Sequence, residues 1–305
     1  MALLGLFRGN GPTGFGFSST SADVTAGLDL SGKTFLVTGV RSGIGANTVT
    51  TLTSKGAHVI ATGRKSEDAA AVLAGAPGTP LSCELSDPAS VRACVTAVKA
   101  TGKKLDGILC NAGVMAIATL QTKHGLEMQF FTNHVGHFIL VTGLLDQLTE
   151  KGRVVMTSSD AHLGAPRVGI DFDNLDGSKG YRPWAFYGQS KLANLLFARQ
   201  LAKRLAGSGR TANAIHPGVI NTGLQRHMSP IARVGMSVVA PIGFKSIPQG
   251  AATQCFVATH PKAEGVTGEY WADCNLKRSS RNGRDLALAE KLWAKTEEIV
   301  ARLLR

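Results

Sequence analysis

The chain has 305 residues, 44% of them hydrophobic and 18% charged, and its formal net charge is +12. These values are ordinary for a water-soluble globular protein that is long enough to bury a sizeable core. No run of about 18 apolar residues occurs, which excludes a transmembrane helix.

Charge distribution and cysteine usage narrow the class of protein further. The Lys and Arg residues are scattered along the chain, so we expect a solvated basic surface and no nucleic-acid site. The cysteines form no CxxC pair, which predicts reduced thiols, no metal site and a cytoplasmic location. They are Cys83, Cys94, Cys110, Cys255 and Cys274.

The start of the chain does not have the order of a signal peptide, because its first basic residue, Arg8, follows the short apolar stretch. Residues 9–21 are rich in Gly, Ser and Thr, and we expect them to be a loosely ordered part of an N-terminal arm, residues 1–30. No repeat or linker divides the remainder, so residues 31–305 are predicted to form a single domain.

Strand-like apolar runs alternate with helical patterns along this domain. Strands are predicted at 34–38, 58–62, 81–85, 107–110, 153–157, 211–215 and around 268–271. Helices are predicted from 44, after 62, from 88, and over 126–148, 185–205 and 285–304. This alternation predicts an α/β fold: a doubly wound, Rossmann-like domain with a mainly parallel seven-stranded sheet and helices on both faces. Ligands are expected at the carboxyl ends of the strands.

A glycine-rich turn joins the first strand to the first helix. Glycines permit close approach of the backbone to a pyrophosphate, and the N-terminus of the helix offers free N–H groups. Such a turn can also be only a turn, but the strand before it and the helix after it favour a dinucleotide site. The candidate residues are Gly39, Arg41, Ser42, Gly43, Ile44 and Gly45.

The end of the second strand indicates which dinucleotide binds. NAD-binding domains usually place an acid there, whereas this chain has Gly63 followed by Arg64 and Lys65. A guanidinium pairs with a 2′-phosphate in bidentate fashion, so Arg64, assisted by Arg41, predicts NADPH/NADP+ as the cofactor. The alternative is that Arg64 and Lys65 only end the strand in solvent.

Tyr187 and Lys191 are four residues apart in a predicted helix and therefore lie on one face of it. A nearby ammonium stabilises a phenolate and brings the pKa of the tyrosine closer to the working pH. The pair is common by chance when it stands alone.

Further motifs accompany this pair in a fixed order. They are Asn111-Ala112-Gly113, Asn133 in the central helix, Thr157-Ser158-Ser159, and Pro217-Gly218-Val219-Ile220-Asn221-Thr222. With the glycine turn and the Tyr187–Lys191 pair, this set resembles the short-chain dehydrogenase/reductase (SDR) family over roughly residues 31–224. Within the family, the chain resembles one branch most, on the basis of the long interval between Ser159 and Tyr187, the stretch at 133–138 and the Gly63-Arg64 pair. This branch holds retinol dehydrogenases, WW-domain oxidoreductase-like proteins and protochlorophyllide reductases, and this chain is most like its bacterial members.

The resemblance implies a role for each catalytic residue. Tyr187 is expected to be the general acid in reduction, and Lys191 to bind the nicotinamide ribose and depress the pKa of Tyr187. Ser159, chosen over Ser158 by its place in the motif, is expected to hold the substrate oxygen, and Asn133 to anchor a water. His134, His137 and His162 form no metal-ligand set and are expected to have packing or surface roles.

The resemblance also extends the cofactor site. Asn111, Ala112 and Gly113 are expected to support the cofactor, and Thr222 to bind its carboxamide beside Pro217, Gly218 and Val219. Family members often have Asp where this chain has Glu84, so the expected contact of Glu84 and Leu85 with adenine departs from the pattern.

The predicted function is NADPH-dependent reduction of a carbonyl, or oxidation of the matching alcohol, in a bulky and mostly apolar small molecule. The segment 223–245 is expected to be a substrate lid, because it offers apolar side chains between glycines. The alternative function is a nucleotide-sensing or interaction protein on the same scaffold. The sequence does not decide between a monomer and a homo-oligomer.

Overall fold

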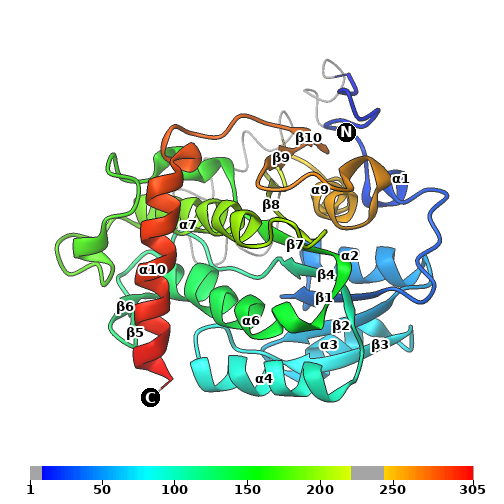
Figure 1. Cartoon of the computed structure of the whole chain (residues 1–305), viewed down its shortest axis with the longest axis horizontal. Coiled ribbons are helices and arrows are strands. Elements are labelled where there is room, and N and C mark those ends of the chain that lie inside the picture. The colour runs from blue at the N-terminus through cyan, green and yellow to red at the C-terminus, as the bar shows by residue number, and fades with distance from the viewer. Residues whose placement is uncertain (1–8, 221–243, 305) are drawn as a thin grey trace.

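The computed structural model describes residues 9–220 and 244–304 (Figure 1). The strands are β1 Thr34–Thr38, β2 His58–Gly63, β3 Gly78–Ser82, β4 Leu105–Cys110, β5 Thr122–Lys123, β6 Leu126–Glu127, β7 Leu148–Thr157, β8 Thr211–His216, β9 Tyr270–Ala272 and β10 Asn275–Leu276.

The α-helices in these ranges are α1 Ser21–Val24, α2 Gly43–Thr53, α3 Ser66–Leu73, α4 Pro88–Ala100, α5 Met128–Phe130, α6 Gly136–Leu144, α7 Pro183–Arg204, α9 Ile247–Thr259 and α10 Leu286–Leu303. A π-helical turn, η2, covers Phe131–Val135. Short 3₁₀ turns are η3 Leu145–Gln147, η4 Asp160–Gly164, η5 Phe172–Asn174, η7 Pro261–Ala263 and η8 Asn282–Arg284.

The central sheet has the strand order β10-β9-β8-β7-β4-β1-β2-β3 among the described residues. Every neighbouring pair is parallel except β9 and β10. The doubly wound α/β prediction is therefore confirmed, with eight strands where seven were expected. The additional strand, β10, is only two residues long and follows a turn in which Asp273 and Cys274 have positive φ.

Two hydrophobic layers cover the two faces of this sheet. One layer packs α4, α6, α7 and α10 against the strands, and the other packs α2, α3 and α9. In β1, Leu36 belongs to the first layer, whereas Phe35 and Val37 belong to the second, because successive side chains point to opposite faces. Burying each such side chain contributes about 1.5–3 kcal/mol, which holds the carboxyl ends of the strands in register.

The predicted helix over 126–148 is wrong in detail. Residues 126–127 form β6, which pairs antiparallel with β5, and the helical run begins at Met128 and passes through the π turn. The third strand was also expected at 81–85 but occupies Gly78–Ser82, so Glu84 and Leu85 lie beyond its end.

The arm at 9–21 is ordered by contacts with the far end of the sheet, which the loosely ordered prediction missed. The Asn275 side chain accepts a hydrogen bond from the Thr13 backbone N–H at 3.1 Å and donates one to the Phe15 carbonyl at 2.9 Å. The Phe15 ring meets the Phe256 ring of α9 edge-on, with centroids 5.6 Å apart. The division at residue 30 stays a prediction.

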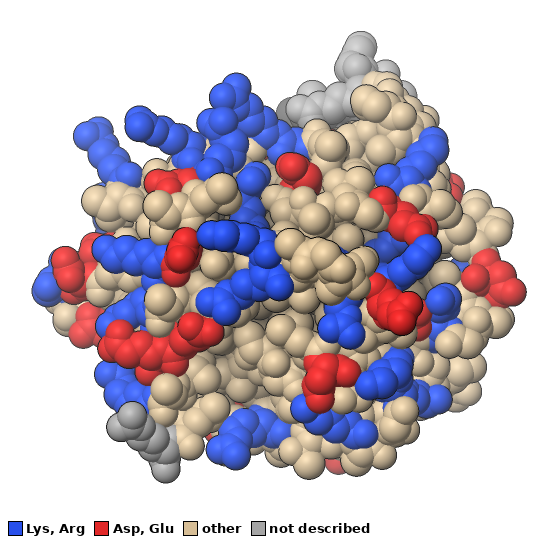
Figure 2. All heavy atoms as spheres, viewed as in Figure 1, with Lys and Arg blue, Asp and Glu red and all other residues tan. Residues whose placement is uncertain are grey.

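Figure 2 shows Lys and Arg side chains spread over the visible face, with Asp and Glu between them. This mixture fits a solvated basic surface, and the absence of nucleic acid among the partners stays a prediction. The five cysteines are free and buried. Within residues 9–220 and 244–304, no helix is long and apolar enough to span a bilayer.

Candidate active site

The ends of β1 and β4 meet at the glycine turn. Gly39 has a φ of +72°, and a Cβ atom there would lie 2.8 Å from the Ala112 Cα, so only glycine fits. A Cβ on Gly45 would lie 2.7 Å from Asn111 Nδ2, which donates to the Thr38 carbonyl at 2.9 Å. Asn111 and Ala112 therefore hold the turn in place, and their expected support of the cofactor stays a prediction.

The N-terminus of α2 opens from this turn. Its N-cap residue, Ser42, forms no side-chain cap hydrogen bond, and the first turn of the helix contains no acid. The first N–H groups of the helix thus keep their capacity to donate, and with the close-packed glycines they form a cradle that fits a pyrophosphate.

The cations beside this cradle differ in their partners. Arg41 Nε lies 3.7 Å from Asp68 Oδ1, whereas Arg64, exposed at the end of β2, forms no ion pair within the described residues. Arg64 is therefore the more available of the two guanidinium groups for an anion. No acid replaces Gly63 at the end of β2.

The carboxylate of Glu84 is bound within its own turn. Its Oε1 accepts hydrogen bonds from the Ser86 backbone N–H at 3.0 Å and the Ser86 hydroxyl at 2.9 Å, which caps the turn that follows β3. Leu85 is buried, and its carbonyl lies directly against the Cα of Gly136, where a Cβ would collide with it. The adenine contact expected of these two residues stays a prediction.

Ser159 and Tyr187 come together because a loop approaches a helix very closely. A Cβ on Gly188 of α7 would lie 2.6 Å from the Ala161 carbonyl of η4, so this glycine admits the loop. Burial raises the pKa of Tyr187 to about 12, and a hydrogen bond with the Ser159 hydroxyl opposes that rise. The neighbouring Ser158 points away and donates to the Lys191 backbone carbonyl at 2.7 Å.

Lys191 lies beneath the tyrosine on the same helix. Its Nζ is 5.6 Å from the centre of the Tyr187 ring and donates to the Thr157 carbonyl at 3.0 Å. Burial lowers the pKa of the Lys191 ammonium from 10.5 to about 8, because the charged form loses hydration. The ammonium is charged at neutral pH. Burial raises the pKa of Tyr187, so the lowering of that pKa expected from Lys191 stays a prediction.

Asn133 completes the group, although its side chain is fully engaged with protein. Its Oδ1 accepts from the Val114 N–H at 2.8 Å, and its Nδ2 donates to the Val114 carbonyl and to the Ser190 hydroxyl, each at 2.9 Å. A Cβ on Gly113 would lie 3.0 Å from Asn133 Oδ1 and 3.4 Å from Lys191 Nζ. Gly113 therefore leaves the room in which the asparagine and the lysine lie together.

The residues that follow β8 were also predicted to belong to the site. Pro217 and Gly218 follow β8, and Gly218 has a φ of +94° with the buried stem of Lys245 2.6 Å from where its Cβ would be. Val219 is exposed. Thr222 and nearly all of the predicted lid, residues 223–245, lie outside the described residues.

Two neighbours of these residues were not predicted as site residues. Trp184 lies one turn before Tyr187, is 47% exposed, and meets the Tyr187 ring edge-on at 6.1 Å. His137 lies one turn after Asn133 and hydrogen-bonds its backbone carbonyl. The signal for both was a spacing of three or four residues from a catalytic position in a helix.

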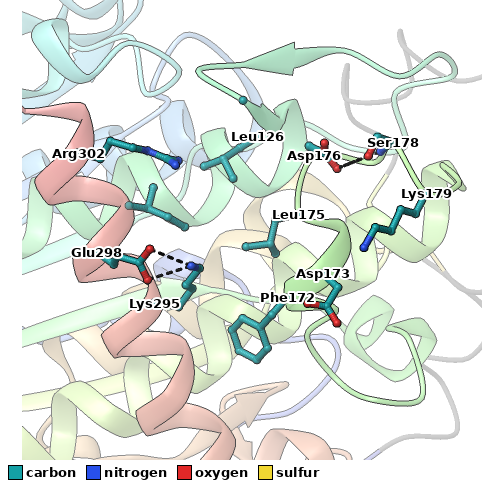
Figure 3. Close-up of a pocket in the computed structure, with 12 residues that line it drawn as sticks. Leu126, Phe172, Asp173, Leu175, Asp176, Ser178, Lys179, Lys295, Glu298 and Arg302 are labelled. Carbon is teal, nitrogen blue, oxygen red and sulfur yellow. Dashed lines mark hydrogen bonds and ion pairs between the residues drawn. The ribbon is translucent and has the colours of Figure 1, made fainter.

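A separate surface hollow of about 260 Å³ lies between η5 and α10 (Figure 3). Lys295 and Glu298 form an ion pair at its wall, and none of the predicted site residues lines it.

The buried charge of Lys191 predicts that Lys191→Met stabilises the protein. A pKa lowered from 10.5 to about 8 corresponds to a burial cost of about 3 kcal/mol below pH 8. Methionine removes this cost, and the Thr157 carbonyl keeps its bond from Asn194 Nδ2 at 3.1 Å. We expect a higher melting temperature at pH 7 together with loss of activity.

The pH dependence provides the control for this variant. The folded lysine binds fewer protons than the unfolded one between pH 8 and 10.5, so wild-type stability should gain over this range as the cost is relieved, and the variant should lack that gain. A lower melting temperature of Lys191→Met at pH 7 would contradict the assignment of a costly buried charge.

Comparison with known proteins identifies the family of the chain. A family model described as Enoyl-(Acyl carrier protein) reductase matches residues 39–272. Short-chain dehydrogenase TIC 32 B, chloroplastic, from Brassica napus is 39% identical over 96% of this chain and 97% of the relative. Retinol dehydrogenase 12 from Mus musculus is 39% identical over 88% of this chain and 86% of the relative.

Solved structures agree with these relatives. The crystal structure of an uncharacterized protein from Mycobacterium Paratuberculosis matches with a TM-score of 0.76 and 30% identity, over 93% of this chain and 98% of that one. A short chain dehydrogenase from Burkholderia cenocepacia in complex with NADP matches with a TM-score of 0.63 and 27% identity, over 80% of this chain and 96% of that one. The chain is therefore an oxidoreductase-family protein, and it belongs to the short-chain dehydrogenase/reductases.

Proposed function

We propose that the protein is an NADPH-dependent oxidoreductase that reduces a carbonyl group, or oxidises the matching alcohol, of a bulky and mostly apolar small molecule. The observation that carries this proposal is the convergence of Ser159, Tyr187 and Lys191 beside a glycine cradle. The solved relative from Burkholderia cenocepacia that holds NADP supports the choice of cofactor. The cytoplasmic location stays part of the proposal.

The residues of the site divide the work of reduction. Bound NADPH would supply a hydride to the carbonyl carbon. The Ser159 hydroxyl holds the substrate oxygen, and Tyr187, which burial keeps protonated at neutral pH, donates its proton to that oxygen. The Lys191 ammonium then stabilises the phenolate that remains.

Cofactor binding would use the cradle around Gly39, Gly43 and Gly45 for the pyrophosphate, with Arg64 on the 2′-phosphate. Asn111, Ala112 and Gly113 hold the shape of this cradle, whereas Asn133 supports the nicotinamide end through Val114. Pro217, Gly218, Val219 and Thr222 are proposed to lie along the carboxamide.

The direct test is consumption of NADPH in the presence of ketones, aldehydes, quinones and an unsaturated thioester. The thioester is included because the description of the matching family model names an enoyl reductase. Turnover of the carbonyl compounds supports the proposal. Turnover of the thioester alone would replace it, and tight NADPH binding without any turnover would favour the sensor alternative.

Trp184 predicts how the enzyme ranks its substrates. A half-exposed indole beside the Tyr187 ring offers an apolar wall to a substrate held at the phenol, and burial against it strengthens binding by roughly 1.5–3 kcal/mol for a large side chain. We expect catalytic efficiency to rise with hydrophobic size across a carbonyl series. Trp184→Ala should raise KM about tenfold or more for large carbonyls and little for small ones.

Trp184→Phe is the matched control, because it keeps an aromatic wall and should retain most of the preference. Equal losses for small and large substrates would assign Trp184 a structural role. A preference of the wild type for short, charged substrates would contradict the apolar substrate class.

A further inference from the structure

His137 is completely buried between the cofactor cradle and the catalytic group. Its Nδ1 lies 2.9 Å from the backbone carbonyl of Asn133, and its Nε2 lies 3.0 Å from the Thr38 hydroxyl. Thr38 is the last residue of β1, directly before Gly39, and its Oγ1 accepts the Ala112 N–H at 3.0 Å. One imidazole thus connects the turn at the end of β1, the loop after β4 and Asn133, whose side chain lies with Lys191 beside Gly113.

The hydrogen-bond partners of the His137 ring show which of its two nitrogens carries the proton. A carbonyl oxygen has no hydrogen to give, so Nδ1 carries the proton and donates it to Asn133. The Thr38 hydroxyl then donates to Nε2 while it accepts from Ala112. Burial lowers the pKa of His137 to about 4, and the nearby Lys191 charge acts in the same direction, so the neutral ring persists throughout the working range.

The Asn133 carbonyl that His137 binds belongs to the π turn. Asn133 lies within η2, where the regular α-helical hydrogen-bond register is interrupted, and His137 follows in the first turn of α6. Since the Asn133 side chain is bound to Val114 and Ser190, its backbone carbonyl and its side chain are both held by protein groups. A shift of His137 would move the carbonyl and with it the asparagine beside Lys191 and Gly113.

We propose that His137, as the neutral Nδ1–H tautomer, is a positioning residue that links the cofactor cradle at Thr38 and Ala112 to Asn133. The proposal rests on the proposed function, since it gives Asn133 and Lys191 their task. Nδ1 sets the position of Asn133 and so acts on turnover. Nε2 fixes Thr38 and so acts on cofactor affinity.

Two substitutions separate the two halves of the ring. His137→Asn places an amide N–H close to where Nδ1 was and removes the Nε2 acceptor of the Thr38 hydroxyl, which keeps only the longer contact with the Leu109 carbonyl at 3.5 Å as an acceptor. His137→Gln reaches toward Thr38 and loses the donor to Asn133. We expect His137→Asn to keep kcat within a few-fold and to weaken the Kd for NADPH about 2- to 10-fold.

The glutamine variant should behave in the opposite way. His137→Gln should lower kcat about 5- to 100-fold with little change in the NADPH Kd, because the Asn133 carbonyl loses the N–H of the imidazole ring. His137→Phe should show both losses. The readouts are NADPH binding, steady-state kinetics and the melting temperature of each variant.

His134 provides a matched control three residues earlier. It is equally buried, has its pKa lowered to about 3 by burial, and hydrogen-bonds Thr296 of α10 at 3.0 Å. His134→Phe should lower the melting temperature while kcat and the NADPH Kd stay near wild type. If the His137 variants lose kcat and affinity together, in proportion to their loss of stability, His137 is only structural.

A spectroscopic measurement tests the tautomer without any turnover. Nitrogen NMR of the ¹⁵N-histidine-labelled full chain, assigned by loss of one signal in His137→Phe, should show the Nδ1–H form from pH 6 to 8. The Nε2–H form or a titrating ring would overturn the inference. Retained turnover in Tyr187→Phe would instead overturn the proposed function, so the two failures are distinguishable.

Discussion

Replacing Tyr187 by phenylalanine should lower turnover by about 10²- to 10⁴-fold, because the ring stays and the proton donor is lost. The phenol is buried and hydrogen-bonded with Ser159, and the Lys191 ammonium lies 5.6 Å from the centre of its ring. The NADPH Kd should change little, since the phenol contacts the reacting oxygen. Single-turnover kinetics with saturating NADPH measures the effect on the chemical step.

Tyr181→Phe is the matched control for this variant. In the wild type, the Tyr181 hydroxyl donates to the Ile117 carbonyl at 2.7 Å and accepts from Gln129 Nε2 at 3.0 Å. The substitution therefore removes a similar hydroxyl outside the catalytic set. Turnover should survive in Tyr181→Phe. Near-wild-type turnover in Tyr187→Phe would show that another group donates the proton.

Introducing an acid with Gly63→Asp should reverse or erase the preference for NADPH over NADH. The carboxylate would repel a 2′-phosphate and accept a bond from a ribose 2′-hydroxyl, and a charge-assisted contact is worth about 1.5–3 kcal/mol. We therefore expect the ratio of kcat/KM values for the two cofactors to fall by about 10- to 100-fold. The position tolerates a side chain only tightly, since a Cβ would lie 3.2 Å from the Lys65 carbonyl.

Arg64→Ala tests the same contact without adding bulk, and Lys65→Ala is its control. Arg64→Ala should weaken NADPH and spare NADH, whereas Lys65→Ala should leave the ratio nearly unchanged. If the wild type uses both cofactors equally well at physiological salt, Arg64 is only a surface residue.

The sequence was informative where a pattern is local. Apolar runs located the parallel strands, and because these strands end at one edge of the sheet, motifs at positions 39, 111, 159 and 217 were expected to meet there. The i and i+4 spacing placed Tyr187 and Lys191 on one helix face, and the structure has both on α7. The choice of Ser159 over Ser158 came from the motif, and the opposite directions of the two side chains agree with it.

The features that were missed leave no periodic pattern in the sequence. His137 was expected to be a packing residue, because its partner Thr38 is 99 residues away. The π turn interrupts a pattern that reads as one helix, and β10 is too short to leave an apolar run. The hydrogen bonds of the Glu84 carboxylate with Ser86 also follow no periodicity, and the expected contact of Glu84 with adenine stays a prediction.

The contact between the arm and Asn275 has a consequence for biosynthesis. The hydrogen bonds of Thr13 with Asn275 join residues 262 positions apart, so the arm leaves the ribosome long before its partner exists. A domain folds as a unit, so this segment has to wait for β10. Until then the Phe15 ring lacks its place against α9 and is open to chaperones and proteases. The hydrogen bonds of the arm with Asn275 can therefore form only after translation has passed β10.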